Sequence, residues 1–132
     1  MQGFFPELSV QEVNQIGMLS LAHVGDAVYE LLVRSRLCME NHTAVTQLHR
    51  LTVSQVNAVA QAQAAEKILP LLTEEERSVY KRGRNAKVNS VPHHAEIAQY
   101  HAATGLEALF GWLYLQGRKE RLEELFIHIT EE

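Results

Sequence analysis

The stretch SLAHVGDAVYELLVRSRL, residues 20–37, decides the fold class, because its apolar residues recur at helical spacing. A Gly-Asp pair, Gly25 and Asp26, interrupts this apolar stripe. Glycine costs a helix interior about 1 kcal/mol relative to alanine, and a carboxylate among apolar neighbours loses solvation. Neither residue stabilises the helix, so we expect both to serve function. Asp26 is also the only aspartate of the chain, since the other fifteen acidic residues are glutamates.

The rest of the chain also has helical periodicity. A short helix is predicted over residues 8–17, where Ser9 and Glu12 have the spacing of a capping box. A third helical region is predicted from Thr43, as its cap, to about Leu69, with a bend or break near Thr52.

Pro70 should end that region, and Thr73 with Glu76 should cap the next helix. Residues 82–92 are predicted to form a loop, followed by a helix from Pro92 with a bend at Gly105. Gly117 should end this element before a last amphipathic helix, and no strand pattern of period two persists. The sequence therefore predicts an all-α fold, with residues 1–132 forming a single domain.

Composition describes an ordinary globular chain, with 46% hydrophobic and 21% charged residues. The N-terminal segment has no basic leader, and no apolar run reaches the roughly 18 residues that a membrane span requires. The single cysteine, Cys38, cannot form an internal disulfide, which fits a reducing compartment. We therefore expect a cytoplasmic protein without a membrane partner.

Positive charge is concentrated in one segment although the net charge is −4. Residues 77–95 contain five cations and no acid, which leaves seven cations against sixteen acids elsewhere. A local basic patch is typical of proteins that bind phosphates.

A second carboxylate, Glu107, lies in the apolar segment ATGLEALFGWLYL, without a cation near enough in sequence for a helical ion pair. Asp26 also lacks a cation at helical spacing. Two buried, unpaired carboxylates would each lose several kcal/mol of solvation unless a cation lies between them or they protonate. Mg²⁺ prefers carboxylate oxygens and is commonly held by one or two of them plus substrate phosphate. Together with the basic segment, this pattern indicates metal-assisted hydrolysis of a phosphodiester.

Three motifs resemble those of the ribonuclease III family. HVGDAVYELLVR resembles the family's signature helix, and TGLEALFGWLYL resembles its second acidic motif. KRGRNAK is similar to the loop motif of the mini-ribonuclease III branch, which consists of the catalytic domain without a double-stranded RNA-binding domain. The three motifs occur in the family's order and cover nearly the whole chain.

This resemblance implies a dimeric, Mg²⁺-dependent endoribonuclease, with Mn²⁺ as a possible substitute, that cleaves double-stranded RNA. Asp26 and Glu107 would be its catalytic residues and metal ligands. Three other acidic positions of ordinary ribonuclease III are absent, being Leu19, Ala22 and Thr104 here, which implies fewer protein ligands per metal.

Without a separate RNA-binding domain, the catalytic domain would hold the RNA itself through the predicted basic loop, at Arg82, Arg84, Asn85 and Lys87. The branch further implies a homodimer that acts on the precursor of large-subunit (23S) ribosomal RNA.

The sequence leaves two alternatives open. The chain could be a catalytically inactive helical protein that binds double-stranded RNA or assists ribosome assembly, although it retains both Asp26 and Glu107. An all-α DNA-binding regulator is disfavoured, because no compact helix-turn-helix places the basic residues on a recognition helix. Glu30 could reach a metal bound at Asp26, but a salt bridge with Arg34, four residues on, is the preferred interpretation.

Overall fold

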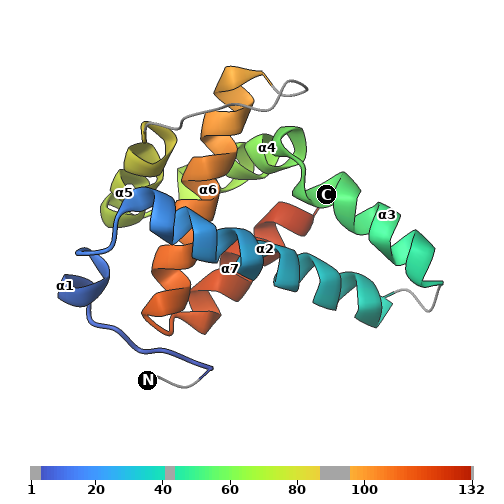
Figure 1. Ribbon diagram of the computed structural model, residues 1–132, viewed down its shortest axis with the longest axis horizontal. Helices are drawn as coiled ribbons and strands as arrows, with labels where there is room; N and C mark the ends of the chain where they lie inside the picture. Colours follow the sequence, from blue (N-terminus) through green and yellow to red (C-terminus); the bar gives the residue numbers. More distant parts are fainter. Residues whose placement is uncertain (1–3, 41–43, 87–95, 132) are drawn as a thin grey trace.

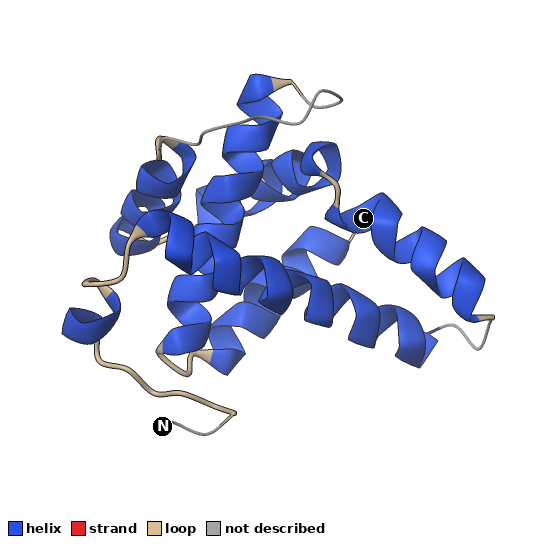
Figure 2. Ribbon diagram, in the orientation of Figure 1, coloured by secondary structure: helices blue, strands red, loops and turns tan. Residues whose placement is uncertain are grey.

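The computed structural model describes residues 4–40, 44–86 and 96–131, and within these ranges it contains helices and no strand (Figure 2). The all-α prediction is confirmed. The elements are α1 (Val10–Val13), α2 (Met18–Glu40), α3 (Val45–Val56), α4 (Ala58–Ile68), the short 3₁₀ helix η1 (Leu69–Leu71), α5 (Glu74–Arg84), α6 (Ile97–Leu115) and α7 (Lys119–Thr130). No helix in the described ranges is both long and apolar enough to cross a membrane.

Helix α6 forms the centre of the domain. Figure 1 shows α2, α4, α5 and α7 arranged around it, and each of them packs against α6. Its side chains supply much of the core, including the fully buried Leu106, Leu109, Phe110 and Leu113. A helix that is apolar around most of its circumference is stable only when neighbours cover it on several sides. This position explains why the apolar segment around Glu107 is so long.

Gly25 of α2 and Gly111 of α6 let these two helices cross with their backbones in contact. A Cβ atom added to Gly25 would lie 1.6 Å from the backbone oxygen of Glu107, and one added to Gly111 would lie 2.0 Å from the backbone oxygen of Leu21. No side chain fits at either position. Gly25 is therefore required by the packing of α2 on α6, and the same contact places Asp26 next to Glu107.

A second pair of glycines, Gly83 of α5 and Gly105 of α6, brings the basic helix equally close. A Cβ atom on Gly83 would lie 2.7 Å from the Cβ of Ala108, and one on Gly105 would lie 2.7 Å from the backbone oxygen of Tyr80. The bend predicted at Gly105 is wrong, because α6 is continuous through this residue. Gly105 serves close packing instead, and Gly105 and Gly111 lie on either side of Glu107 in the sequence of α6.

Both predicted capping boxes are confirmed. The Ser9 hydroxyl accepts from the backbone N–H of Glu12, and that of Thr73 accepts from the backbone N–H of Glu76. The two glutamates accept from the backbone N–H of Ser9 and Thr73 in return. Gly117, with φ of 75°, ends α6 after Leu115 as predicted.

The third helical region is divided at Asn57, and the predicted break near Thr52 is wrong. The Thr52 hydroxyl donates to the backbone oxygen of Leu48 at 2.9 Å, which satisfies it inside α3. Asn57 instead caps α4, because its side-chain oxygen accepts from the backbone N–H of Ala60 at 2.9 Å. Ala44 precedes α3 without a side-chain cap, and the predicted cap Thr43 lies outside the described residues. Pro92, the predicted start of the next helix, also lies outside them, and α6 begins at Ile97.

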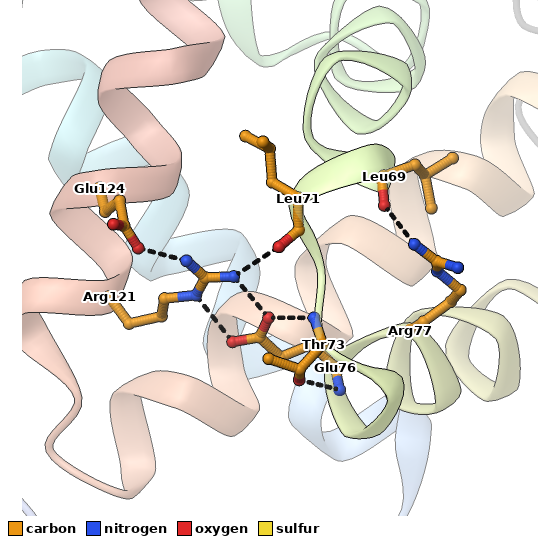
Figure 3. Close-up of polar contacts among 7 residues, drawn as sticks. All are labelled: Leu69, Leu71, Thr73, Glu76, Arg77, Arg121 and Glu124. Carbon is orange, nitrogen blue, oxygen red and sulfur yellow. Dashed lines mark hydrogen bonds and ion pairs between the residues drawn. The ribbon is translucent and has the colours of Figure 1, made fainter.

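A buried ion pair holds the start of α5 against α7 (Figure 3). Arg121 donates from Nε to Oε2 of Glu76 at 2.8 Å and from Nη2 to Oε1 at 2.7 Å. Its guanidinium also bonds Glu124 and the backbone oxygen of Leu71. Burial raises the pKa of Glu76, but the bonds from Arg121 and from the Thr73 backbone outweigh it, and the net pKa is lowered. The pair anchors the N-terminal end of the basic helix.

Candidate active site

Asp26 and Glu107, which are far apart in sequence, are neighbours in the structure. The α2–α6 crossing brings them together, and the pKa of Glu107 is raised to about 8. The main cause of this raised pKa is desolvation, because Glu107 is half-buried. The negative charge of Asp26 and its direct contact with Glu107 raise the pKa further. The sequence-predicted pair is thus one cluster of two carboxyl groups.

The expectation that Asp26 is buried among apolar side chains is wrong for this chain. Asp26 is exposed, while Leu21, Tyr29 and Val33 of the same helix are buried. Gly25 faces α6, and the next residue along the helix turns away toward the surface. Desolvation therefore falls on Glu107, and Asp26 remains accessible to water and to a substrate.

Gln61 of α4 is a third polar group of the cluster and was not predicted from the sequence. Its Nε2 donates to Oε2 of Glu107 at 3.4 Å, and the residue is only 2% exposed. This contact lowers the pKa of Glu107, against the larger effects of burial and Asp26. The spacing in the sequence could have indicated that Gln61 is buried. Gln61 lies four residues before the apolar Ala65, so the two residues share a helix face, and Ile68 lies on the same face. The Ala/Gln-rich composition of this segment indicates only a high helix propensity, which does not distinguish Gln61 from its neighbours.

The donor set suits a hard divalent cation. Among the residues that the structure describes, neither Asp26 nor Glu107 forms an ion pair, and no group of three or more His, Cys, Asp or Glu side chains could hold a metal. Two carboxylates in contact repel one another unless a proton or a cation lies between them. Mg²⁺ accepts so few protein ligands because it retains waters and binds substrate phosphates. Asp26 and Glu107 are therefore the side chains that would hold such an ion.

Two further residues near the acids have other partners. The Thr104 hydroxyl donates to the backbone oxygen of Tyr100 at 3.0 Å, so it bonds within its own helix. Glu30 pairs with Arg34 at 2.6 Å, which confirms the predicted salt bridge.

The basic residues lie on a helix, so the prediction of a loop beginning at residue 82 is wrong. Arg82 and Arg84 belong to the last turn of α5, and Asn85 is its C-cap. Three acids occupy the first turn of this helix and cations its last turn, an order that the helix dipole favours. The glycine crossing with α6 supplies the packing that keeps this turn helical. Lys87 lies outside the described residues.

The cations of α5 have different neighbours. Arg77, Lys81 and Arg82 line a shallow surface groove together with Glu74 and Ser78. The guanidinium of Arg84 lies over the ring of Tyr80, 5.8 Å from its centre. This cation–π contact restricts the orientation of Arg84.

Comparisons with known proteins agree with this geometry. The family model described as Ribonuclease III domain matches residues 19–118. A protein named mini-ribonuclease 3 from Thermoanaerobacter sp. (strain X514) is 42% identical, over 100% of this chain and 97% of its own. Another of that name, from Symbiobacterium thermophilum, is 49% identical over 81% of this chain and 82% of its own.

A crystal structure of a protein from Fusobacterium nucleatum has the same fold. Its TM-score is 0.81 at 28% identity, and the match covers 88% of this chain and 94% of that one. The family match spans α2, α4, α5 and α6, which are the helices that build the two-carboxylate cluster and carry the basic residues. The chain therefore belongs to the ribonuclease III family, in the branch of its mini-ribonuclease 3 relatives, and is an endoribonuclease of that type.

Proposed function

We propose that this enzyme hydrolyses double-stranded RNA with Mg²⁺, or Mn²⁺ in its place, held by Asp26 and Glu107. The observation that carries the proposal is the contact of these two carboxyl groups, without an ion-pair partner in the described structure, across a helix crossing that has no room for side chains. The different exposure of the two acids supports the proposal as well. Asp26 is exposed and accessible to a phosphate, whereas Glu107 is half-buried and accepts a hydrogen bond from Gln61.

The roles of the two acids follow from their positions. A bound Mg²⁺ ion would activate a water and stabilise the leaving oxygen of the phosphodiester. Glu107 keeps a fixed carboxylate at the packed helix crossing, and Asp26 presents its own at the surface where the RNA backbone arrives.

The cations of α5 would hold the RNA backbone. Duplex RNA is bound mostly through its shape, its phosphates and its 2′-hydroxyls, so a row of cations can bind it without reading sequence. Arg82 and Arg84 are the proposed phosphate contacts, with Asn85 as a neutral donor and Lys87, outside the described residues, as a further cation. The Gly83–Gly105 contact supports this role, because it ties the cationic turn to the helix that carries Glu107.

A homodimer is supported by an apolar surface on α2. Val24, Ala27, Val28 and Leu31 line it together with Phe4 and Tyr114. Contiguous exposed apolar surfaces of this kind usually mark interaction sites. We propose that a second copy of the chain covers this surface.

The proposed substrate is the precursor of large-subunit (23S) ribosomal RNA.

Cleavage of a labelled RNA duplex tests the proposal. The purified protein should cut the duplex in Mg²⁺, stop when EDTA is added, and leave a DNA duplex of the same sequence intact. Binding of the RNA duplex without cleavage in Mg²⁺ or Mn²⁺ would favour the inactive RNA-binding alternative. Accumulation of unprocessed large-subunit precursor in cells that lack the protein would support the specific substrate.

A further inference from the structure

Gln61 is a buried amide in a position where stability alone favours an apolar residue. It belongs to the face of α4 that packs on α6, with Ala64, Ala65 and Ile68 as its buried neighbours on that helix. A buried amide loses solvation that only a hydrogen bond recovers. The side-chain Nε2 of Gln61 donates to Oε2 of Glu107 at 3.4 Å.

The backbone around Gln61 fixes where the amide points. Asn57 divides α3 from α4 and caps α4, and the backbone N–H of Gln61 donates to the backbone oxygen of Asn57 at 3.0 Å. Gln61 therefore lies in the first turn of a helix whose start is determined by a side-chain cap. The direction of its side chain toward α6 is set before any ligand binds.

The chemistry of an amide suits a neighbour of a metal-binding carboxylate. A lysine at this position would neutralise Glu107 and compete with the cation, whereas a glutamate would add a third negative charge to the cluster. An amide N–H orients a carboxylate oxygen and leaves its charge in place. Hydrogen bonds of this kind are often long without ligand and tighten in the complex.

We infer that Gln61 is a positioning residue, which holds the carboxylate of Glu107 in the orientation that binds the divalent cation beside Asp26. This inference rests on the proposed function of the two acids and adds a neutral donor from a third helix. Groups that orient metal ligands typically contribute 10- to 100-fold to metal affinity or activity.

Gln61→Met tests the inference, because it removes the donor and keeps the length of the side chain. Gln63→Met is the matched control, since Gln63 is an exposed residue of the same type on the same helix. Binding of Mn²⁺ to the RNA-free protein is measured by titration calorimetry, and the Mg²⁺ concentration for half-maximal cleavage is measured separately.

Gln61→Met should bind Mn²⁺ about 10-fold or more weakly and should require correspondingly more Mg²⁺ for cleavage. Its melting temperature in EDTA should equal or exceed that of wild type, while Gln63→Met matches wild type in every measurement. Wild-type metal affinity in folded Gln61→Met overturns the inference. A lower maximal rate at an unchanged Mg²⁺ midpoint also overturns it, because Gln61 would then act on the substrate.

Gln61→Glu keeps the test decisive if the methionine variant does not fold. Its added carboxylate should lower the melting temperature in EDTA, and Mn²⁺ should raise that temperature by more than it does in wild type. A metal-induced shift equal to that of wild type contradicts the inference. If wild type neither binds the metal nor cleaves the duplex, the proposed function fails and this inference with it. If wild type does both and the Gln61 variants respond to metal as it does, only the inference fails.

Discussion

At the scale of single residues, the site depends on two carboxyl groups in different environments. Asp26 is exposed and Glu107 is half-buried, so the removal of either charge has a separate consequence. Asp26→Asn keeps the size of the side chain and removes one of only two proposed protein ligands. We expect cleavage to fall by orders of magnitude, with the fold intact by circular dichroism.

The same variant supplies its own control. Asp26→Asn retains every cation of α5, so it should bind duplex RNA about as well as wild type when Mg²⁺ is absent. Robust Mg²⁺-dependent cleavage by Asp26→Asn would refute its role as a metal ligand.

Glu107 makes the stability of the metal-free protein depend on pH. Its pKa is raised to about 8 in the folded chain, so folding favours the protonated form. The stability that this group contributes is complete below the ordinary glutamate value of 4.5 and is lost as pH rises toward 8. Glu107→Gln removes this dependence, so in EDTA the variant should exceed wild type in free energy of unfolding at pH 8, by about 1–3 kcal/mol.

Urea denaturation at pH 5 and pH 8 measures this difference. The gap between Glu107→Gln and wild type should shrink at pH 5, where wild-type Glu107 is largely protonated. An equal gap at both pH values would show that the carboxyl is not raised in pKa. Mg²⁺ should stabilise wild type and leave Glu107→Gln unchanged, if this carboxylate binds the ion.

At the scale of helices, the site depends on how closely α2 approaches α6. Gly25→Ala places a methyl group 1.6 Å from the backbone oxygen of Glu107, so the helices must separate. Overpacking of this kind typically lowers the free energy of unfolding by about 1–3 kcal/mol. Here the atom in the way is a backbone oxygen, which cannot rotate aside as a side chain can. We expect a lower melting temperature together with weaker metal binding, because the separation also moves Asp26 away from Glu107.

Gly17→Ala is the matched control, since an added Cβ at Gly17 meets nothing within 4 Å. It should match wild type in stability and in cleavage. If Gly25→Ala proved equally harmless, the close crossing of α2 and α6 would not be needed for the site.

The cations of helix α5 are predicted to contribute to RNA binding. Arg82→Ala combined with Arg84→Ala removes two cations from its last turn. Affinity for unrelated RNA duplexes should fall alike, and the slope of log K against log salt should decrease by about one unit per lost contact. Binding is measured by fluorescence anisotropy at several salt concentrations.

The control removes the same charge elsewhere. Arg118→Ala combined with Lys119→Ala takes two exposed cations from the start of α7 and should change affinity and salt slope less. Equal effects of the two double variants would mean that α5 has no special part in binding RNA.

At the scale of the whole molecule, we propose that the apolar surface of α2 forms the contact between two copies of the chain. Leu31 is 54% exposed within this surface, whereas Ile127 of α7 is 53% exposed outside it. Leu31→Glu should convert a dimer to a monomer, because a carboxylate would be buried against a second copy. Light scattering should give about half the mass for Leu31→Glu and the wild-type mass for the control Ile127→Glu. A monomeric wild-type protein would exclude the proposed dimer.

The sequence alone determined the features that depend on local periodicity and local hydrogen bonds. The all-α fold follows from apolar residues at helical spacing, and the capping boxes at Ser9 and Thr73 need only four consecutive residues each. The choice of Asp26 and Glu107 as a pair also came from the sequence, because unpaired acids in apolar helices are rare enough to require a reason.

Only the tertiary structure decided how these elements meet. Gly25, Gly83, Gly105 and Gly111 are interpreted locally as weak points of helices, yet each one adjoins the backbone or a side chain of another helix. The exposure of Asp26 and the helical state of Arg82 and Arg84 follow from those crossings. The contact of Gln61 with Glu107 follows from the packing of α4 on α6. Local propensity cannot supply them, because the atoms that fix each of these residues belong to helices distant in the sequence.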